Sequence, residues 1–495
     1  MQFTVNDNAM KTYNPADIWS IFDYSKALIG HTLRELVSEE ELMASNLRGQ
    51  GKGGLEHMLE ALYFKYPINS DPGPDFREAG LELKGTGLKI LQSTGEYAIK
   101  ERLVCDMVDY CSIISQSFEE SPFYLKCKLM LLIFYLYEKE KHKIDLKFIY
   151  TVLWQIPEKD LLMMKNDFAV IIEKIKQGKA HELSEGDTEY LAVCRKGQKG
   201  DKPRRQPCSP IPAPARAFSL KPSYMRTVLE YVKSSEIPYV SNIERIENKT
   251  NITSGFGQLV TAEQLQTDSF EDIILQRFTP YIGKNVEYIM NSFDSDSNLE
   301  AKDINYRAAC LIASDGKCNG RGANKIEHTD EFRKAGITLK TIPTYASGVI
   351  KESMPFKNIN YDEVYSNDNW FDSEVYELFT SRFLMVQFRH PSIRSGSFGK
   401  QNKEMILEKV FFWTMPLPDL EDAREYWENI RENVITDNIR LDAFWNLKMH
   451  RKFHVRPKGT KTSYKNSAYN PNGGSADKYC YWLNANYVKS IVDAN

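Results

Sequence analysis

The sequence lacks the segments that direct a protein out of the cytoplasm or into a membrane. Its start is polar and has neither the basic nor the apolar segment of a secretory signal. Its longest apolar run, Leu129 to Tyr137, is about half the length of a membrane-spanning helix and predicts a buried strand. We therefore expect a cytoplasmic protein without a membrane partner.

The sequence also lacks paired cysteines and an excess of charge of one sign. The eight cysteines form no CxxC pair and no Cys/His quartet, so we expect reduced, buried thiols rather than a zinc site or disulfides. The net charge of −3 gives no overall attraction to polyanions. Any nucleic-acid binding must therefore come from local basic segments, and two are present, at 195–205 and 451–461. Both contain glycine and proline and are expected to be loops.

What the chain does contain is a degenerate internal duplication with an offset of roughly 250 to 265 residues. The clearest pair is Phe76–Lys84 (FREAGLELK) and Phe332–Lys340 (FRKAGITLK). Weaker pairs follow in the same order: 100–101 with 351–352, 129–134 with 384–388, 193–197 with 455–459, and 218–224 with 481–487. The conserved order predicts two copies of one fold, with a first domain at 1–234, a linker at 235–265 and a second domain at 266–495.

Within each half, expected strands alternate with helical stretches, such as 54–66 and 160–176 in the first half. This alternation is typical of an α/β or α+β domain built around a central mixed sheet. We expect one such domain in each copy.

The first copy contains a pattern suited to hydrolysis of phosphodiester bonds. Asp75 precedes a turn, and Glu82 and Lys84 follow on an apolar strand. Strand alternation places Glu82 and Lys84 on one face, while Leu81 and Leu83 point into the core. Carboxylates supply the oxygen ligands that Mg²⁺ prefers, and a lysine can orient or deprotonate a metal-bound water. Alone, this short pattern is more often a solvated charge pair on a half-exposed strand.

Glu60 is a further candidate acid. It lies on an expected helix whose apolar stripe is Leu55, Met58, Leu59 and Leu62. Glu56 and Glu60 both lie at the margin of that stripe.

These segments together resemble the MutH-like endonucleases. The family pattern is a Lys-Gly, a helix glutamate eight residues after the lysine, a Pro-Asp, and Gly-(Ile/Val/Leu)-Glu-Leu-Lys. The matching residues are Lys52-Gly53, Glu60, Pro74-Asp75 and 80–84. Over nearly its whole length the chain is similar to the two-domain, GATC-cutting type II restriction enzymes of this family, including 179–186, 190–191 and 216–221.

The resemblance implies a restriction-endonuclease-like PD-(D/E)xK fold in both copies and a type II restriction endonuclease that cuts double-stranded DNA at a short palindrome, GATC, with Mg²⁺. Asp75, Glu82 and the Leu83 carbonyl would then bind the metal. Lys84 would assist the attacking water, and Glu60 would be an accessory acid.

The resemblance implies a second catalytic lysine, and Lys126 matches its spacing within Ser121–Lys126. Lys128 is an alternative, and an ordinary lysine at a strand edge is an equally simple interpretation.

DNA contacts are implied for Lys52 and Gly53 and for Arg195 and Lys196 in the first basic loop. Here the family's Arg-Pro-Lys triplet is replaced by residues 194–196 (Cys-Arg-Lys). Its tyrosine near the end of the domain is replaced by Ser219. Which side chains read the bases is therefore left open.

The second copy has lost part of the acidic pattern. Glu331 stands where the first copy has Asp75, Thr338 replaces Glu82, and Lys340 is retained. A hydroxyl cannot replace the central carboxylate ligand of Mg²⁺, so this copy is expected not to cut. Arg456 and Lys458, in an Arg-Pro-Lys triplet, match the DNA-contacting pattern of the family.

The second copy is therefore expected to be an effector domain that binds a second recognition site, as in similar type IIE enzymes. A structural half that completes a DNA clamp is the alternative. A single active site cannot cut both strands of a palindrome at once, so either a homodimer assembles on DNA or the strands are nicked in succession. A cognate DNA methyltransferase is implied as a functional partner.

Two other functions are considered. A mismatch-repair nickase of the same family would have one copy, whereas this chain has two. A GATC-binding or methylation-sensing protein that does not cut would not need Asp75, Glu82 and Lys84 to be intact together.

Overall fold

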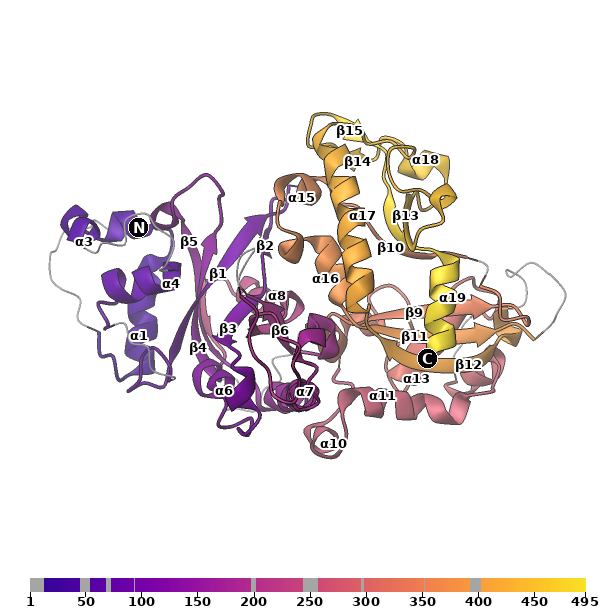
Figure 1. The fold of residues 1–495 in the computed structure, drawn as a ribbon, viewed down its shortest axis with the longest axis horizontal. Helices are drawn as coiled ribbons and strands as arrows, with labels where there is room; N and C mark the ends of the chain where they lie inside the picture. Colours follow the sequence, from indigo (N-terminus) through magenta and orange to yellow (C-terminus); the bar gives the residue numbers. More distant parts are fainter. Residues whose placement is uncertain are drawn as a thin grey trace. The chain divides into compact units, whose positions relative to one another are not determined.

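The computed structural model describes residues 13–44, 54–67, 73–92, 94–196, 202–243, 257–294, 298–350, 352–391 and 402–495. They form a mixed α/β structure, which confirms the predicted fold class (Figure 1). The chain divides into two compact units, one of 1–161 with 195–254 and one of 162–194 with 255–495. Among the described residues, no helix is long and apolar enough to cross a membrane. All eight cysteines are free, but Cys111 and Cys208 are exposed, so the expectation of buried thiols is wrong for these two.

A five-stranded mixed sheet is the centre of the first unit, with the strand order β2-β1-β4-β5-β8. Strand β1 runs parallel to β4, with Leu83 opposite Leu131, and β4 runs antiparallel to β5. The predicted buried strand is confirmed as β4, whose residues 130–134 are buried. The strands are β1 (Glu82–Ile90), β2 (Tyr97–Ile99), β4 (Leu129–Leu136), β5 (Phe148–Gln155) and β8 (Tyr239–Ser241).

Helices cover both faces of this sheet (Figure 1). The predicted helix at 54–66 is confirmed as α4 (Leu55–Met58), which continues into a π-helical turn at Leu59–Tyr63. Its apolar side packs with α1 on the core side that contains Leu83. On the other face, Tyr231 of α8 contacts Trp154 of β5, with ring centroids 5.6 Å apart. The remaining elements of this unit include α1 (Ile18–Ser25), α2 (Leu33–Leu36), α3 (Glu39–Ala44), α5 (Tyr110–Ile113), α6 (Pro122–Cys127), α8 (Pro222–Lys233), and the antiparallel pair β3 (Leu103–Met107) and β7 (Arg216–Leu220).

The second unit repeats the central strand arrangement of the first. Strand β9 (Thr338–Thr344) runs parallel to β11 (Phe383–Arg389), with Leu339 opposite Leu384, and β11 runs antiparallel to β12 (Ile406–Trp413). The β1-β4-β5 strands of the first unit have the same directions and order. Two equal strand topologies at the positions of the sequence repeat indicate two copies of one fold.

Helices also cover both faces of the β12-β11-β9 sheet (Figure 1). In the view, α11 and α13 lie on one side of it and α17 and α19 on the other. Lys409 of β12 donates to the Val492 carbonyl of α19 at 2.9 Å. The helices are α10 (Ala262–Thr267), α11 (Phe270–Phe278), α12 (Val286–Ser292), α13 (Ile304–Ala313), α14 (Asp330–Ala335), α15 (Tyr361–Ser366), α16 (Glu374–Thr380), α17 (Leu417–Ile435), α18 (Lys461–Tyr464) and α19 (Ala485–Ala494).

A second sheet of this unit has one face packed against the core. Its antiparallel strands are ordered β10 (Met354–Asn358), β16 (Cys480–Leu483) and β13 (Phe453–Arg456). Phe453 and Val455 face the core, and strand alternation places His454, Arg456 and the cross-strand partner Trp482 on the opposite face.

The compact units differ from the predicted domain boundaries in two places. Strand β8 lies within the predicted linker. It nevertheless pairs with β5 and forms the last strand of the first sheet. Residues 162–194 belong to the second unit, although the sequence places them in the first domain. The helix predicted at 160–176 is confirmed as α7 (Glu158–Lys176), and it passes from one unit into the other, as does β6 (Leu191–Arg195).

The segment 162–194 is held in the second unit by specific contacts. Arg382 forms an ion pair with Glu189 at 2.6 Å and also contacts Glu271. Tyr376 donates to Glu185 at 3.0 Å. These contacts join residues far apart in the sequence, so sequence periodicity could not reveal them.

The buried His454 is expected to make the stability of the second unit depend on pH. It is 1% exposed, and burial, with a smaller effect of Arg456, lowers its pKa from 6.5 to about 4. Above pH 6.5 the imidazole is neutral in both the folded and unfolded chain. Between pH 6.5 and 4 only the unfolded chain takes up the proton, so we expect stability to fall as the pH falls, by up to about 1.4 kcal/mol per pH unit.

Urea unfolding at pH 7.5 and pH 5, in the wild type and in His454→Phe, tests this expectation. The variant lacks the titrating ring and should lose less stability between the two pH values. An equal loss in both proteins would contradict the assignment to His454.

Candidate active site at the edge of the first sheet

One end of β1 forms an open edge of the first sheet. Among the described residues, β2 pairs only with residues 88–90 of β1, so the amides of Leu83 and Gly85 have no neighbouring strand. They donate instead to carboxylates, Leu83 N to Asp75 Oδ2 at 2.9 Å and Gly85 N to Glu56 Oε1 at 2.9 Å. The carboxylates of Asp75 and Glu56 thus accept the backbone hydrogen bonds that a neighbouring strand would otherwise accept.

The predicted pair on β1 lies as strand alternation requires. The Lys84 ammonium donates to Glu82 Oε1 at 2.6 Å, and the Asp75 amide donates to Glu82 Oε2 at 3.2 Å. Glu82 and Lys84 are 2% and 7% exposed, while Leu81 and Leu83 are fully buried in the core. The structure therefore brings Asp75, Glu82 and Lys84 together.

Glu60 joins this group from the π-helical turn. Burial, the charge of Asp75 and a hydrogen bond with its carboxyl group raise the pKa of Glu60 to about 8. Burial raises the pKa of Glu82 to about 7, although Lys84 opposes the shift. The buried carboxyl groups of Glu60 and Glu82 and the half-buried one of Asp75 repel one another, and a bound cation would relieve that repulsion.

Lys84 remains charged despite its burial. Burial lowers the pKa of Lys84, but the carboxylates of Glu56 and Glu82 raise it above the ordinary value. From the sequence, Glu56 was expected only at the margin of the helix stripe, without a role in the site. Its spacing of four residues from Glu60 places both acids on one helix face, which is the signal that could have identified it.

Lys126 lies at the C-terminal end of α6 rather than at a strand edge. Its ammonium forms an ion pair with Asp106 at 2.8 Å, and the charge of Glu82 acts on it as well. The ammonium of the alternative, Lys128, lies over the ring of Tyr124 at 5.2 Å. Of the two lysines, Lys126 therefore lies near the acidic group.

The donors available for a metal are oxygen atoms. Within the described ranges, no three His, Cys, Asp or Glu side chains form a metal-binding group. Asp75 and Glu82 contribute carboxylates, and the Leu83 carbonyl projects to the same edge as the Leu83 amide. Two carboxylates and a carbonyl suit a hard cation that keeps several waters, as Mg²⁺ does.

The predicted DNA-contacting residues are not all described by the structure. Lys52 and Gly53 lie outside the described residues. Arg195 and Lys196 are exposed at the end of β6, and the Lys196 amide donates to the Ala215 carbonyl at 2.9 Å.

In the second unit, Arg456 is the last residue of β13, and Lys458 lies two residues further along the chain. The Arg456 guanidinium lies 4.5 Å from the centre of the Trp482 ring, and Lys458 is exposed.

The structure corrects one equivalence between the copies. Glu331 was expected to take the place of Asp75, but it is fully buried and accepts from the amides of Leu259 and Val260 at 3.0 and 3.2 Å. The contact that corresponds to that of Asp75 is made by Glu327, whose Oε1 accepts from the Leu339 amide at 3.2 Å. Residues 330–335 form helix α14, whereas the first copy has turns before β1, so the acid expected at the edge turns inward.

Comparison with known proteins agrees with this geometry. The family model of the DNA mismatch repair enzyme MutH matches residues 64–167. The type II restriction enzyme Sau3AI of Staphylococcus aureus is 30% identical over 512 aligned positions, which cover 96% of this chain and 98% of that enzyme. The chain belongs to the MutH family of endonucleases.

This chain therefore acts on DNA as a deoxyribonuclease, since it matches both the MutH family model and, over nearly its whole length, a type II restriction enzyme. The segment matched by the MutH model contains Asp75, Glu82, Lys84 and Lys126. The match to the restriction enzyme extends through both copies.

Proposed function

We propose that this endonuclease cuts double-stranded DNA at GATC with Mg²⁺, using one active site in the first unit. The observation that supports the position of the site is the convergence of Asp75 and Glu82 on the open edge of β1, beside the buried ammonium of Lys84. The GATC sequence comes from the family resemblance.

Each residue of the site has a separate role. Asp75, Glu82 and the Leu83 carbonyl would hold a Mg²⁺ ion, which would supply activation of the nucleophile and neutralisation of charge on the phosphate. Lys84 orients the attacking water, and its bond to Glu82 positions the ammonium. Glu60 is the accessory acid and fixes Asp75 through their shared hydrogen bond. Lys126 places a second positive charge beside Glu82, where a phosphate oxygen would lie.

The second unit is proposed to bind DNA without cutting it. Thr338 occupies the position of Glu82, so only one of the two carboxylates, Glu327, remains at the edge. Arg456 and Lys458 would contact the DNA, as Lys52, Gly53, Arg195 and Lys196 would in the first unit. We propose that binding of a second GATC site here stimulates cleavage by the first unit; a clamp would bind DNA without stimulation.

Cleavage of both strands requires either two chains on one palindrome or two successive nicks. A DNA methyltransferase that protects the host sites is the expected functional partner.

The deciding experiment is incubation of the purified chain with unmethylated plasmid and Mg²⁺, followed by sequencing of the ends. Ends at GATC that disappear when EDTA is added would support the proposal. Ends at another sequence would reject GATC but keep the nuclease. Binding to GATC without any cut would favour the methylation-sensing alternative.

A further inference from the structure

A cavity of about 430 Å³ lies on the outer face of the β10-β16-β13 sheet, opposite the core. Strands β13 and β16 contribute Arg456 and Trp482 to its lining. The start of helix α19 contributes Asn484 and Ala485. All residues that line the cavity belong to the second unit, whose chemistry of cleavage is expected to be lost.

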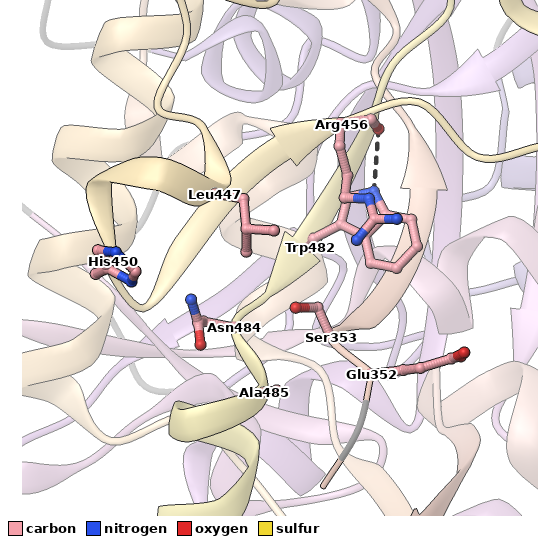
Figure 2. Close-up of a pocket in the computed structure, with 8 residues that line it drawn as sticks. All are labelled: Glu352, Ser353, Leu447, His450, Arg456, Trp482, Asn484 and Ala485. Carbon is pink, nitrogen blue, oxygen red and sulfur yellow. Dashed lines mark hydrogen bonds between the residues drawn. The ribbon is translucent and has the colours of Figure 1, made fainter. Parts of the chain in front are cut away.

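The Arg456 side chain is held in place without an acidic partner. Its guanidinium lies 4.5 Å from the centre of the Trp482 ring, and the indole N–H of Trp482 donates to the Arg456 carbonyl at 3.0 Å (Figure 2). Arg451 and Lys452, earlier in the same segment, form ion pairs with acidic residues. Among the described residues, Arg456 forms none. A guanidinium stacked on an aromatic ring keeps the N–H groups along its edge available for an anion.

Asn484 presents a second donor to the same cavity. It is the N-cap of α19, and its Oδ1 accepts from the Asn486 amide at 3.0 Å, which leaves the N–H groups of Nδ2 for another acceptor. The side chain is only 9% exposed, and no partner of Nδ2 is found within the described ranges. The first turn of α19 adds the positive end of a helix dipole. The carboxylate of Glu352, which also lines the cavity, points away from Asn484 (Figure 2).

We propose that this cavity binds a backbone phosphate of DNA, with Arg456 and Asn484 as its donors and Trp482 as the residue that positions Arg456. The inference rests on the proposed binding of DNA by the second unit and names its point of contact. A concave site lined by donors suits a phosphate, because phosphate oxygens only accept hydrogen bonds and lie on the outside of the duplex. The base edges of an intact duplex lie inside its grooves, where a protruding helix or strand pair reaches them.

The sharpest test is Asn484→Asp in the full chain that also carries Asp75→Asn. Aspartate caps a helix as well as asparagine does, so the fold is kept, but a negative charge replaces the Nδ2 donor that faces the phosphate. Binding of a short GATC duplex is measured by titration calorimetry in EDTA, and the event of the second unit is the one weakened by Lys458→Ala. We expect Asn484→Asp to weaken this event about tenfold or more, and Asn484→Ser, an uncharged cap, to weaken it less.

Variants of the stacked pair test the other half of the site. Arg456→Gln should weaken the same event about tenfold and reduce the slope of its salt dependence by about one. The loss should be equal for a GATC duplex and a scrambled duplex, because a phosphate contact carries no sequence information. Trp482→Leu should weaken binding about threefold, whereas Trp482→Phe, which keeps an aromatic ring under the guanidinium, should bind as the wild type does. Lys489→Met removes one positive charge from α19 outside the cavity lining and is the control.

Wild-type binding by both Asn484→Asp and Arg456→Gln would overturn the phosphate site, even where Lys458→Ala shows that the second unit binds DNA. A loss confined to the GATC duplex would assign the cavity to base reading and overturn the site as well. Inorganic phosphate that binds the wild type but not Asn484→Asp, with equal duplex binding by both, would assign the cavity to free phosphate instead of DNA. If neither Lys458→Ala nor any cavity variant weakens a binding event, the proposed DNA binding by the second unit fails, and this inference fails with it.

Discussion

Replacement of Asp75 by asparagine is expected to slow DNA cleavage by about 1000-fold or more, or roughly 4 kcal/mol, without unfolding the chain. Asparagine keeps an oxygen that can accept from the Leu83 amide, so the edge of β1 stays satisfied. It removes the negative charge that a hard cation needs from its ligand. The measurement is the rate of plasmid cleavage at saturating Mg²⁺, together with the affinity for DNA in EDTA.

The matched control is Glu78→Gln, which removes an exposed carboxylate three residues further along the same loop. It should cut DNA at close to the wild-type rate. Cleavage by Asp75→Asn within about tenfold of the wild type would mean that Asp75 is not a metal ligand.

Gly186→Ala is expected to destabilise the second unit by about 3 kcal/mol or more. A Cβ atom at this position would lie 2.1 Å from Thr414 Cγ2 and 2.6 Å from the Thr380 carbonyl oxygen. The Thr414 side chain can move, but the Thr380 backbone cannot move without shifting the end of α16. The same residue is also held by a hydrogen bond from the Thr414 hydroxyl to the Gly186 carbonyl at 2.8 Å.

Urea unfolding followed by tryptophan fluorescence measures this effect, because five of the seven tryptophans lie in the second unit. Gly257→Ala is the control, since nothing lies within 4 Å of the added Cβ there. Adding Thr414→Ala to Gly186→Ala should restore part of the stability, because it removes the Thr414 Cγ2 atom that the new Cβ would meet. The restoration should be incomplete, because the close contact with the Thr380 carbonyl remains. A variant as stable as the wild type would show that residues 162–194 are not packed against the second unit in this way.

The sequence by itself determined the features that depend on local patterns. Alternation along one strand was sufficient to place Glu82 and Lys84 on one face and Leu83 in the core, because side-chain direction in a strand repeats every two residues. The order of the repeated segments predicted two copies of one fold, and the apolar run at 129–137 predicted the central strand β4. The family resemblance could be read from motifs of this length.

Only the tertiary structure decided which distant residues meet. Glu56 became part of the site because the open edge of β1 left the Gly85 amide without a strand partner. Glu327 rather than Glu331 took the role of Asp75 because a helix formed where the first copy has turns. Residues 162–194 joined the second unit through the ion pair with Arg382 and the close packing at Gly186. Each of these outcomes depends on shape and on backbone groups at an edge, which a linear pattern of residue types does not encode.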